Sequence, residues 1–262
     1  MSPTKRAHAV AWLACATLVA GGGCATTQED RDLEQRLKQA NSQFEIGLDH
    51  LDKGRYALGL RMLLHAGELD PNNARYQVAI AEAYMHRGRI EEAETHLLRS
   101  LELYPGFHDA RLNLSALYLM IGRNAEAASH SQMLVDDATF PATWRALTNL
   151  GIAEIRLGRL EGARANLTLA TEYNRTYWPA LLALGILEKK EGRLLESIGY
   201  FSRALDQNPS PGARAEVNYR LGEIHVSLGK RDAAVDYLLA AVAQSPGGEW
   251  GKKSEEYLKI LR

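Results

Sequence analysis

The amino-acid sequence predicts an all-α protein, a right-handed α-solenoid of six helix pairs followed by a capping helix. The main observation is a glycine that recurs at intervals of 34, 34, 36, 34 and 37 residues. Self-similarity at such a period is typical of stacked repeats. With 46% hydrophobic and 24% charged residues, the chain also has the composition of an ordered protein. The recurring glycines are Gly54, Gly88, Gly122, Gly158, Gly192 and Gly229.

Other columns keep the same register around these glycines. A large apolar column is followed directly by a small one, and small residues let helix axes approach to roughly 8 to 10 Å. The recurring glycine suits the left-handed backbone that ends a first helix, and a proline closes the second helix of four units. The large apolar column is Ile46, Ile80, Leu114, Leu150, Leu184 and Leu221. The small column is Gly47, Ala81, Ser115, Gly151, Gly185 and Gly222.

These columns resemble the tetratricopeptide repeat, a 34-residue helix-turn-helix unit, over residues 40–248. The resemblance implies six units, at about 40–73, 74–107, 108–143, 144–177, 178–214 and 215–248, and residues 249–262 are expected to form a capping helix. The third and fifth units carry extra residues, at 136–143 and 210–213, which we expect in longer exposed turns.

The first residues have the layout of a secretory signal peptide. Lys5 and Arg6 precede an apolar stretch at 7–20, and Gly21, Gly22 and Gly23 lead to Cys24. The pattern resembles a bacterial lipobox, although Gly21 stands where leucine is usual. The resemblance implies cleavage of residues 1–23, acylation of Cys24 (palmitate) and a lipid-anchored lead segment at 24–39. The alternative is an ordinary signal peptide that leaves Cys24 as a free thiol.

Charge and motifs argue against several functions. Removal of Lys5 and Arg6 with the signal peptide lowers the formal charge from -1 to -3, and no basic stripe indicates nucleic-acid binding. The sequence contains no His-Glu-x-x-His pair, no Cys-x-x-Cys and no Gly-x-Ser-x-Gly elbow. We therefore expect a binding protein with no cofactor and no metal. A hydrolase with an unrecognised site is the alternative of another class.

The repeat register places one face of each first helix on a concave groove. Its candidates include Leu182, Ile186, Tyr219 and Glu223, but the N-terminal half has the more apolar pattern. An apolar strip there would suit an amphipathic helix or an extended peptide; ordinary packing of the same residues is the alternative. The partner-binding residues predicted from the register are Phe44, Leu48, Arg75, Val78 and Leu112.

A lipidated chain filled by six such repeats resembles the pilotin lipoproteins of type IV pilus systems (Tgl, PilF and PilW type). The resemblance implies a protein of the outer membrane, anchored by acyl chains and facing the periplasm. Its partner would be the secretin subunit, whose delivery to that membrane and assembly it promotes. We expect a monomer. The alternative is a repeat lipoprotein that serves as a scaffold for peptidoglycan enzymes or for outer-membrane protein assembly.

Overall fold

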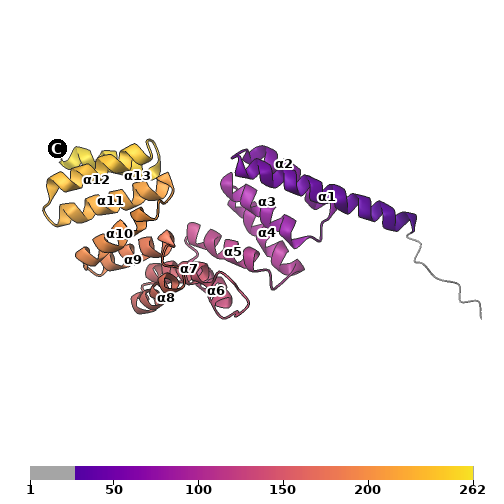
Figure 1. The fold of residues 1–262 in the computed structure, drawn as a ribbon, viewed down its shortest axis with the longest axis horizontal. Coiled ribbons are helices and arrows are strands. Elements are labelled where there is room, and N and C mark those ends of the chain that lie inside the picture. Colours follow the sequence, from indigo (N-terminus) through magenta and orange to yellow (C-terminus); the bar gives the residue numbers. More distant parts are fainter. Residues whose placement is uncertain (1–26, 262) are drawn as a thin grey trace, which may run out of the picture.

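The computed structural model describes residues 27–261, which form thirteen α-helices and no strand (Figure 1). The predicted signal peptide and Cys24 lie outside the described residues. The helices are α1 Gln28–Asp52, α2 Tyr56–Leu69, α3 Ala74–His86, α4 Ile90–Leu103, α5 His108–Met120, α6 Asn124–Val135, α7 Thr143–Arg156, α8 Leu160–Tyr173, α9 Trp178–Lys190, α10 Leu194–Asp206, α11 Pro211–Ser227, α12 Arg231–Gln244 and α13 Glu249–Leu261.

The helices pack as consecutive pairs, α1 with α2 through α11 with α12, and α13 covers the last pair. The pairs follow one another along an arc that opens on one side, with α1 to α3 at one end and α11 to α13 at the other (Figure 1). The fold is therefore the all-helical solenoid that the glycine period predicts. The inner side of the arc is lined by the first helices of the pairs.

The recurring glycines end the first helix of each pair. All six have positive φ, from 68° at Gly54 to 79° at Gly122, a conformation that side chains with a Cβ rarely adopt. The small column explains the close packing within pairs. A Cβ added to Gly47 would lie 2.7 Å from Leu63 Cγ, and one added to Gly222 would lie 2.8 Å from Leu238 Cγ. The sequence-based account of both columns is confirmed.

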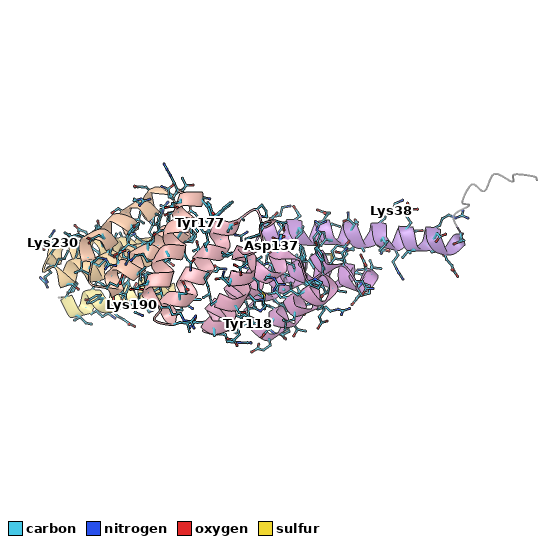
Figure 2. The ribbon with its side chains drawn as sticks, turned by 90° about the horizontal axis from the view of Figure 1, so that it is seen from below. Lys38, Tyr118, Asp137, Tyr177, Lys190 and Lys230 are labelled. Atoms are coloured by element: carbon cyan, nitrogen blue, oxygen red, sulfur yellow. The ribbon has the colours of Figure 1, made fainter. Side chains whose placement is uncertain are left out.

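Helix α1 is longer than the repeat alone predicts. It begins at Gln28, where the Thr27 side chain accepts from the Asp30 backbone amide in a capping box, and runs unbroken to Asp52. Residues 28–39, which were expected in a separate lead segment, and the first helix of the first unit are thus one helix. Its first turns project beyond the other helices, with Lys38 on the projecting part (Figure 2).

The outward face of the first pair is polar. In the second pair, Tyr76 and Ala83 are buried against the first pair. Ser42 and Asp49 hold the same repeat positions on α1, and there they are exposed. Ile46 is 42% exposed, the one exception to the burial of its column. An open solenoid end must avoid an apolar face, and the polar residues of α1 provide this.

The two insertions have different structures. Residues 136–142 form a turn in which Asp137 accepts hydrogen bonds from Thr139 and, at 2.8 Å, from His108. These bonds lower the pKa of Asp137 to about 2, and the bond from the Thr139 side chain has a larger effect than the bond from His108. The second insertion lengthens α11 instead of a turn, because Ser210 caps the helix and Pro211 occupies its first position. The expected longer turn at 210–213 is therefore wrong.

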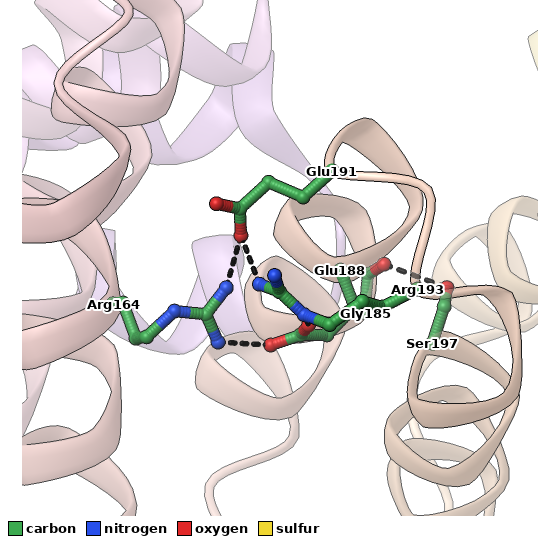
Figure 3. Close-up of polar contacts among 6 residues, drawn as sticks. All are labelled: Arg164, Gly185, Glu188, Glu191, Arg193 and Ser197. Carbon is green, nitrogen blue, oxygen red and sulfur yellow. Dashed lines mark hydrogen bonds and ion pairs between the residues drawn. The ribbon is translucent and has the colours of Figure 1, made fainter.

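A charged cluster joins the fourth and fifth pairs (Figure 3). The Glu188 carboxylate, 2% exposed on α9, accepts from Arg164 on α8 and from Arg193 after α9, and Glu191 accepts from the same two guanidinium groups. Nearby, the Ser197 hydroxyl donates to the Gly185 carbonyl over 2.7 Å. The negative charges of two carboxylates balance the positive charges of two guanidinium groups in this cluster, so the buried carboxylate is fully paired.

Candidate protein-docking groove

The C-terminal half of the concave face contains a cavity of about 610 Å³. It lies between the first helices of the fourth, fifth and sixth pairs and the capping helix. We call it the aromatic pocket, because two tryptophans stand among aliphatic side chains along it. A volume of this size suits several side chains of a bound segment. The aromatic pocket is lined by Ile152, Ile155, Arg156, Trp178, Pro179, Leu182, Ala183, Ile186, Gly212, Ala213, Glu216, Arg220, Ser245, Glu249 and Trp250.

Two cations and one aromatic ring contact the Trp250 ring. The Arg220 guanidinium carbon lies 5.0 Å and the Lys253 ammonium nitrogen 4.2 Å from the ring centroid. Glu216 accepts from Arg220 at 2.6 Å and Glu249 accepts from Lys253 at 2.7 Å, so both cations are already paired with carboxylates. The Tyr219 ring lies 5.3 Å from Trp250. Such a wall is preorganised, which lowers the entropy lost when a partner binds.

A second cavity, of about 510 Å³, lies on the concave face of α3, α5 and the start of α7. We call it the acidic pocket, after the exposed carboxylates of Glu82 and Asp109. Two methionines supply its flexible apolar walls. The acidic pocket is lined by Val78, Glu82, Met85, His86, Asp109, Asn113, Met120 and Arg145.

The structure places most of the predicted partner-binding residues in the interior. Phe44 and Leu112 are each 3% exposed in two different core clusters, and Leu48 packs against the cluster of Phe44. Val78 is also buried, although it reaches the edge of the acidic pocket. Arg75 is exposed, with its guanidinium carbon 5.0 Å from the Phe44 ring centroid. The expected apolar strip is therefore not exposed, because these side chains hold α1, α3, α5 and their partner helices together.

The open apolar surface lies instead in the C-terminal half of the groove. Leu182 and Ile186 are groove candidates in the repeat register, and both line the aromatic pocket. The two tryptophans were missed. Trp178 begins α9, and Trp250 belongs to the capping helix, whose first residues line the aromatic pocket. The signal available in the sequence was the pair of tryptophans at the starts of two predicted helices.

Within residues 27–261, no group of three or more His, Cys, Asp or Glu side chains is placed to hold a metal ion. In the same part of the chain, no helix is both long and apolar enough to cross a membrane. Burial raises the pKa of Tyr177 and of Tyr219 above the usual value. These phenols therefore stay neutral and act as ordinary packing and hydrogen-bonding groups.

Solved structures of similar fold include PilW and PilF. PilW, described as a widely conserved type IV pilus biogenesis factor, matches with a TM-score of 0.71 and 20% identity, over 82% of this chain and 97% of that chain. PilF of Pseudomonas aeruginosa matches with a TM-score of 0.67 and 18% identity, over 85% and 99% of the two chains. At these identities the likeness shows the fold, and the fold extends over nearly the whole of both proteins.

Sequence comparison identifies the repeat itself. A curated relative, the TPR repeat-containing thioredoxin TTL4 of Arabidopsis thaliana, is 35% identical over 102 residues, which are 39% of this chain and only 14% of that protein. A family model described as tetratricopeptide repeat matches residues 44–106 and 182–249, which together make up half of the 262 residues. The chain belongs to the tetratricopeptide repeat family.

Proposed function

We propose that this chain is an outer-membrane lipoprotein, facing the periplasm, that binds secretin subunits and promotes their delivery to that membrane and their assembly in type IV pilus biogenesis. The observation that carries the proposal is the match to PilW and PilF over nearly their whole length. Tetratricopeptide repeats form protein-interaction surfaces, and the concave face here offers an open aromatic pocket. The lipobox-like sequence at Cys24 supports the membrane anchor.

The proposed mechanism needs no chemical step. Acyl chains on Cys24 would hold the solenoid at the target membrane, since each buried methylene contributes about 0.8 kcal/mol and several chains act together. The groove would then hold an apolar segment of the secretin subunit. Tethering raises the local concentration of subunits and keeps their apolar surface covered until they assemble.

Secretin assembly in cells tests the proposal. Deletion of the gene should leave secretin monomers and few detergent-resistant multimers in membrane fractions, and the wild-type gene should restore the multimers. A Cys24→Ser variant should restore them poorly, and intact-mass analysis of the extracted wild-type protein should show the added acyl chains. Unchanged multimers after deletion would reject the secretin role and favour a scaffold for another envelope process.

The aromatic pocket can be blocked without removing any of its contacts. A Cβ added at Gly212, on the first turn of α11, meets no atom within 4 Å, so Gly212→Leu should fold and place a side chain at the pocket. Gly199 on α10 is an equally open helical glycine that lies outside the pocket, and Gly199→Leu is the matched control. We expect Gly212→Leu to lower multimer formation and Gly199→Leu to leave it unchanged.

A further inference from the structure

The aromatic pocket and the acidic pocket lie on one surface. Both are bordered by α7, with Arg145 on the acidic pocket and Ile152 on the aromatic pocket. These two residues are seven positions apart, so they share a helix face about 10 Å from each other along the axis. A single bound segment of three or four helical turns can therefore reach both pockets.

The charges of the aromatic pocket are satisfied within the protein. Arg220 is paired with Glu216, and the Arg156 guanidinium donates to the Leu119 carbonyl. A charged group of a partner would gain little there, because every cation in the pocket already has an acceptor and the remaining walls are apolar. The aromatic pocket selects aliphatic or aromatic side chains.

The acidic pocket differs in this respect. Glu82 and Asp109 are exposed, and neither forms an ion pair among the described residues. The Arg145 side chain on the opposite wall interacts with the Tyr177 hydroxyl, and the His86 ring stacks on Tyr56 with centroids 4.3 Å apart. Neither carboxylate therefore has an ion-pair partner within residues 27–261, although the Arg145 guanidinium lines the same pocket and offsets one of the two negative charges. Glu82 and Asp109 leave the pocket with a net negative charge, and a concave surface strengthens the field of that charge.

We propose that the segment held by this groove is a cationic amphipathic one. Its apolar side chains occupy the aromatic pocket, and Lys or Arg side chains two to three helical turns away bind Glu82 and Asp109. This proposal rests on the proposed docking function and specifies the chemistry of the partner. The same surface disfavours acidic segments, because Glu82 and Asp109 would repel their carboxylates.

Synthetic peptides provide the direct test. Three 16-residue amphipathic peptides would share one Leu/Phe face and differ only at one end, which carries two Lys, two Gln or two Glu. Binding to the full mature chain is followed by tryptophan fluorescence, because Trp178 and Trp250 line the aromatic pocket. We expect the Lys peptide to bind about tenfold more tightly than the Glu peptide at low salt, with a smaller ratio at 0.5 M salt.

Charge reversal at the carboxylates sharpens the test. The double variant Glu82→Lys/Asp109→Lys should reverse the order of the Lys and Glu peptides. Glu161→Lys/Glu172→Lys, on exposed positions of α8, makes the same change in net charge away from the groove and should leave the order unchanged. Equal binding of the three peptides, or an order that Glu82→Lys/Asp109→Lys does not alter, would overturn the proposal.

The two proposals fail in different ways. If deletion of the gene leaves secretin multimers intact while the Lys peptide is still preferred, the secretin role is wrong and the chemistry of the groove stands. If multimers depend on the gene but the peptides bind alike, the docking function stands and the cationic segment is wrong.

Discussion

Substitution of Gly185 by alanine tests the packing that shapes the solenoid. Gly185 lies on α9 where it faces α10, and an added Cβ would overlap two ring carbons of Phe201. The Phe201 side chain is fully buried, so its ring has little room to move. Overpacking of this kind costs about 1 to 3 kcal/mol. Removal of a helical glycine returns up to about 1 kcal/mol.

The expected net effect is a destabilisation of about 0 to 3 kcal/mol, and a control isolates the packing contribution. Gly199→Ala, on the exposed side of α10 with no atom near the added Cβ, gains only the helix propensity of up to about 1 kcal/mol. The two variants should therefore differ by about 1 to 3 kcal/mol. Urea unfolding followed by circular dichroism gives both midpoints, and a thermal scan should separate them by several degrees.

A second substitution should rescue the first. The second pair already holds an alanine at this column, Ala81, and a leucine sixteen residues later, Leu97, where the fifth pair has Phe201; both are fully buried. Phe201→Leu should therefore restore space for Gly185→Ala, with a favourable coupling of about 1 kcal/mol in a double-mutant cycle. The reasoning is refuted if Gly185→Ala is as stabilising as Gly199→Ala, or if the two substitutions are additive.

Three further predictions concern polar groups. Glu188→Gln should destabilise the protein by about 1 to 3 kcal/mol, because it removes the buried charge that pairs with Arg164 and Arg193; the more exposed Glu191→Gln should cost less in the same urea assay, and equal costs would contradict this. Asp137→Asn should lower stability at neutral pH, where the lowered pKa of Asp137 stabilises the fold fully. This contribution is lost as pH falls from 3.8 to about 2, so the difference between the variant and the wild type should shrink over that range. Thermal midpoints from pH 2 to 6 check this, and a constant difference would contradict it. Burial, and then Arg111 and Arg123, lower the pKa of His130 below 6.5, so the neutral ring's contribution to stability is complete above pH 6.5 and is lost as pH falls below 6.5. The variant His130→Phe keeps a ring against Tyr118 and should lose less stability than the wild type between pH 7.5 and 5.5. An identical dependence of stability on pH would rule out His130 as a source of acid sensitivity.

The repeat could be predicted from the sequence because it is a local property. Each glycine with positive φ ends a helix through its own backbone conformation, and each small residue acts through contacts within its own pair. The spacing along the chain is therefore enough to find both. The length of α1 was harder, because residues 28–39 have no neighbouring helix. They are good helix formers without glycine or proline, and this propensity continues the helix past the first contact.

The docking surface could not be predicted in the same way. Whether a side chain of a first helix faces the groove or a neighbouring helix depends on the twist between pairs, which the period does not specify. Phe44 and Leu112 satisfy the apolar pattern of a binding strip, but their neighbours cover them. The aromatic pocket combines residues from α7, α9, α11 and α13, separated by about a hundred positions, and only the curvature of the arc brings them together.

The unbroken course of α1 has a mechanical consequence. A helix of 25 residues is roughly 37 Å long and resists bending, so the projecting N-terminal turns of α1 and the first helix pair move as one rigid body. An attachment at Cys24 would leave only three residues between the lipid anchor and the start of α1 at Gln28. A membrane anchor of that kind would restrict not only how far the groove lies from the lipid surface but also the direction in which it opens.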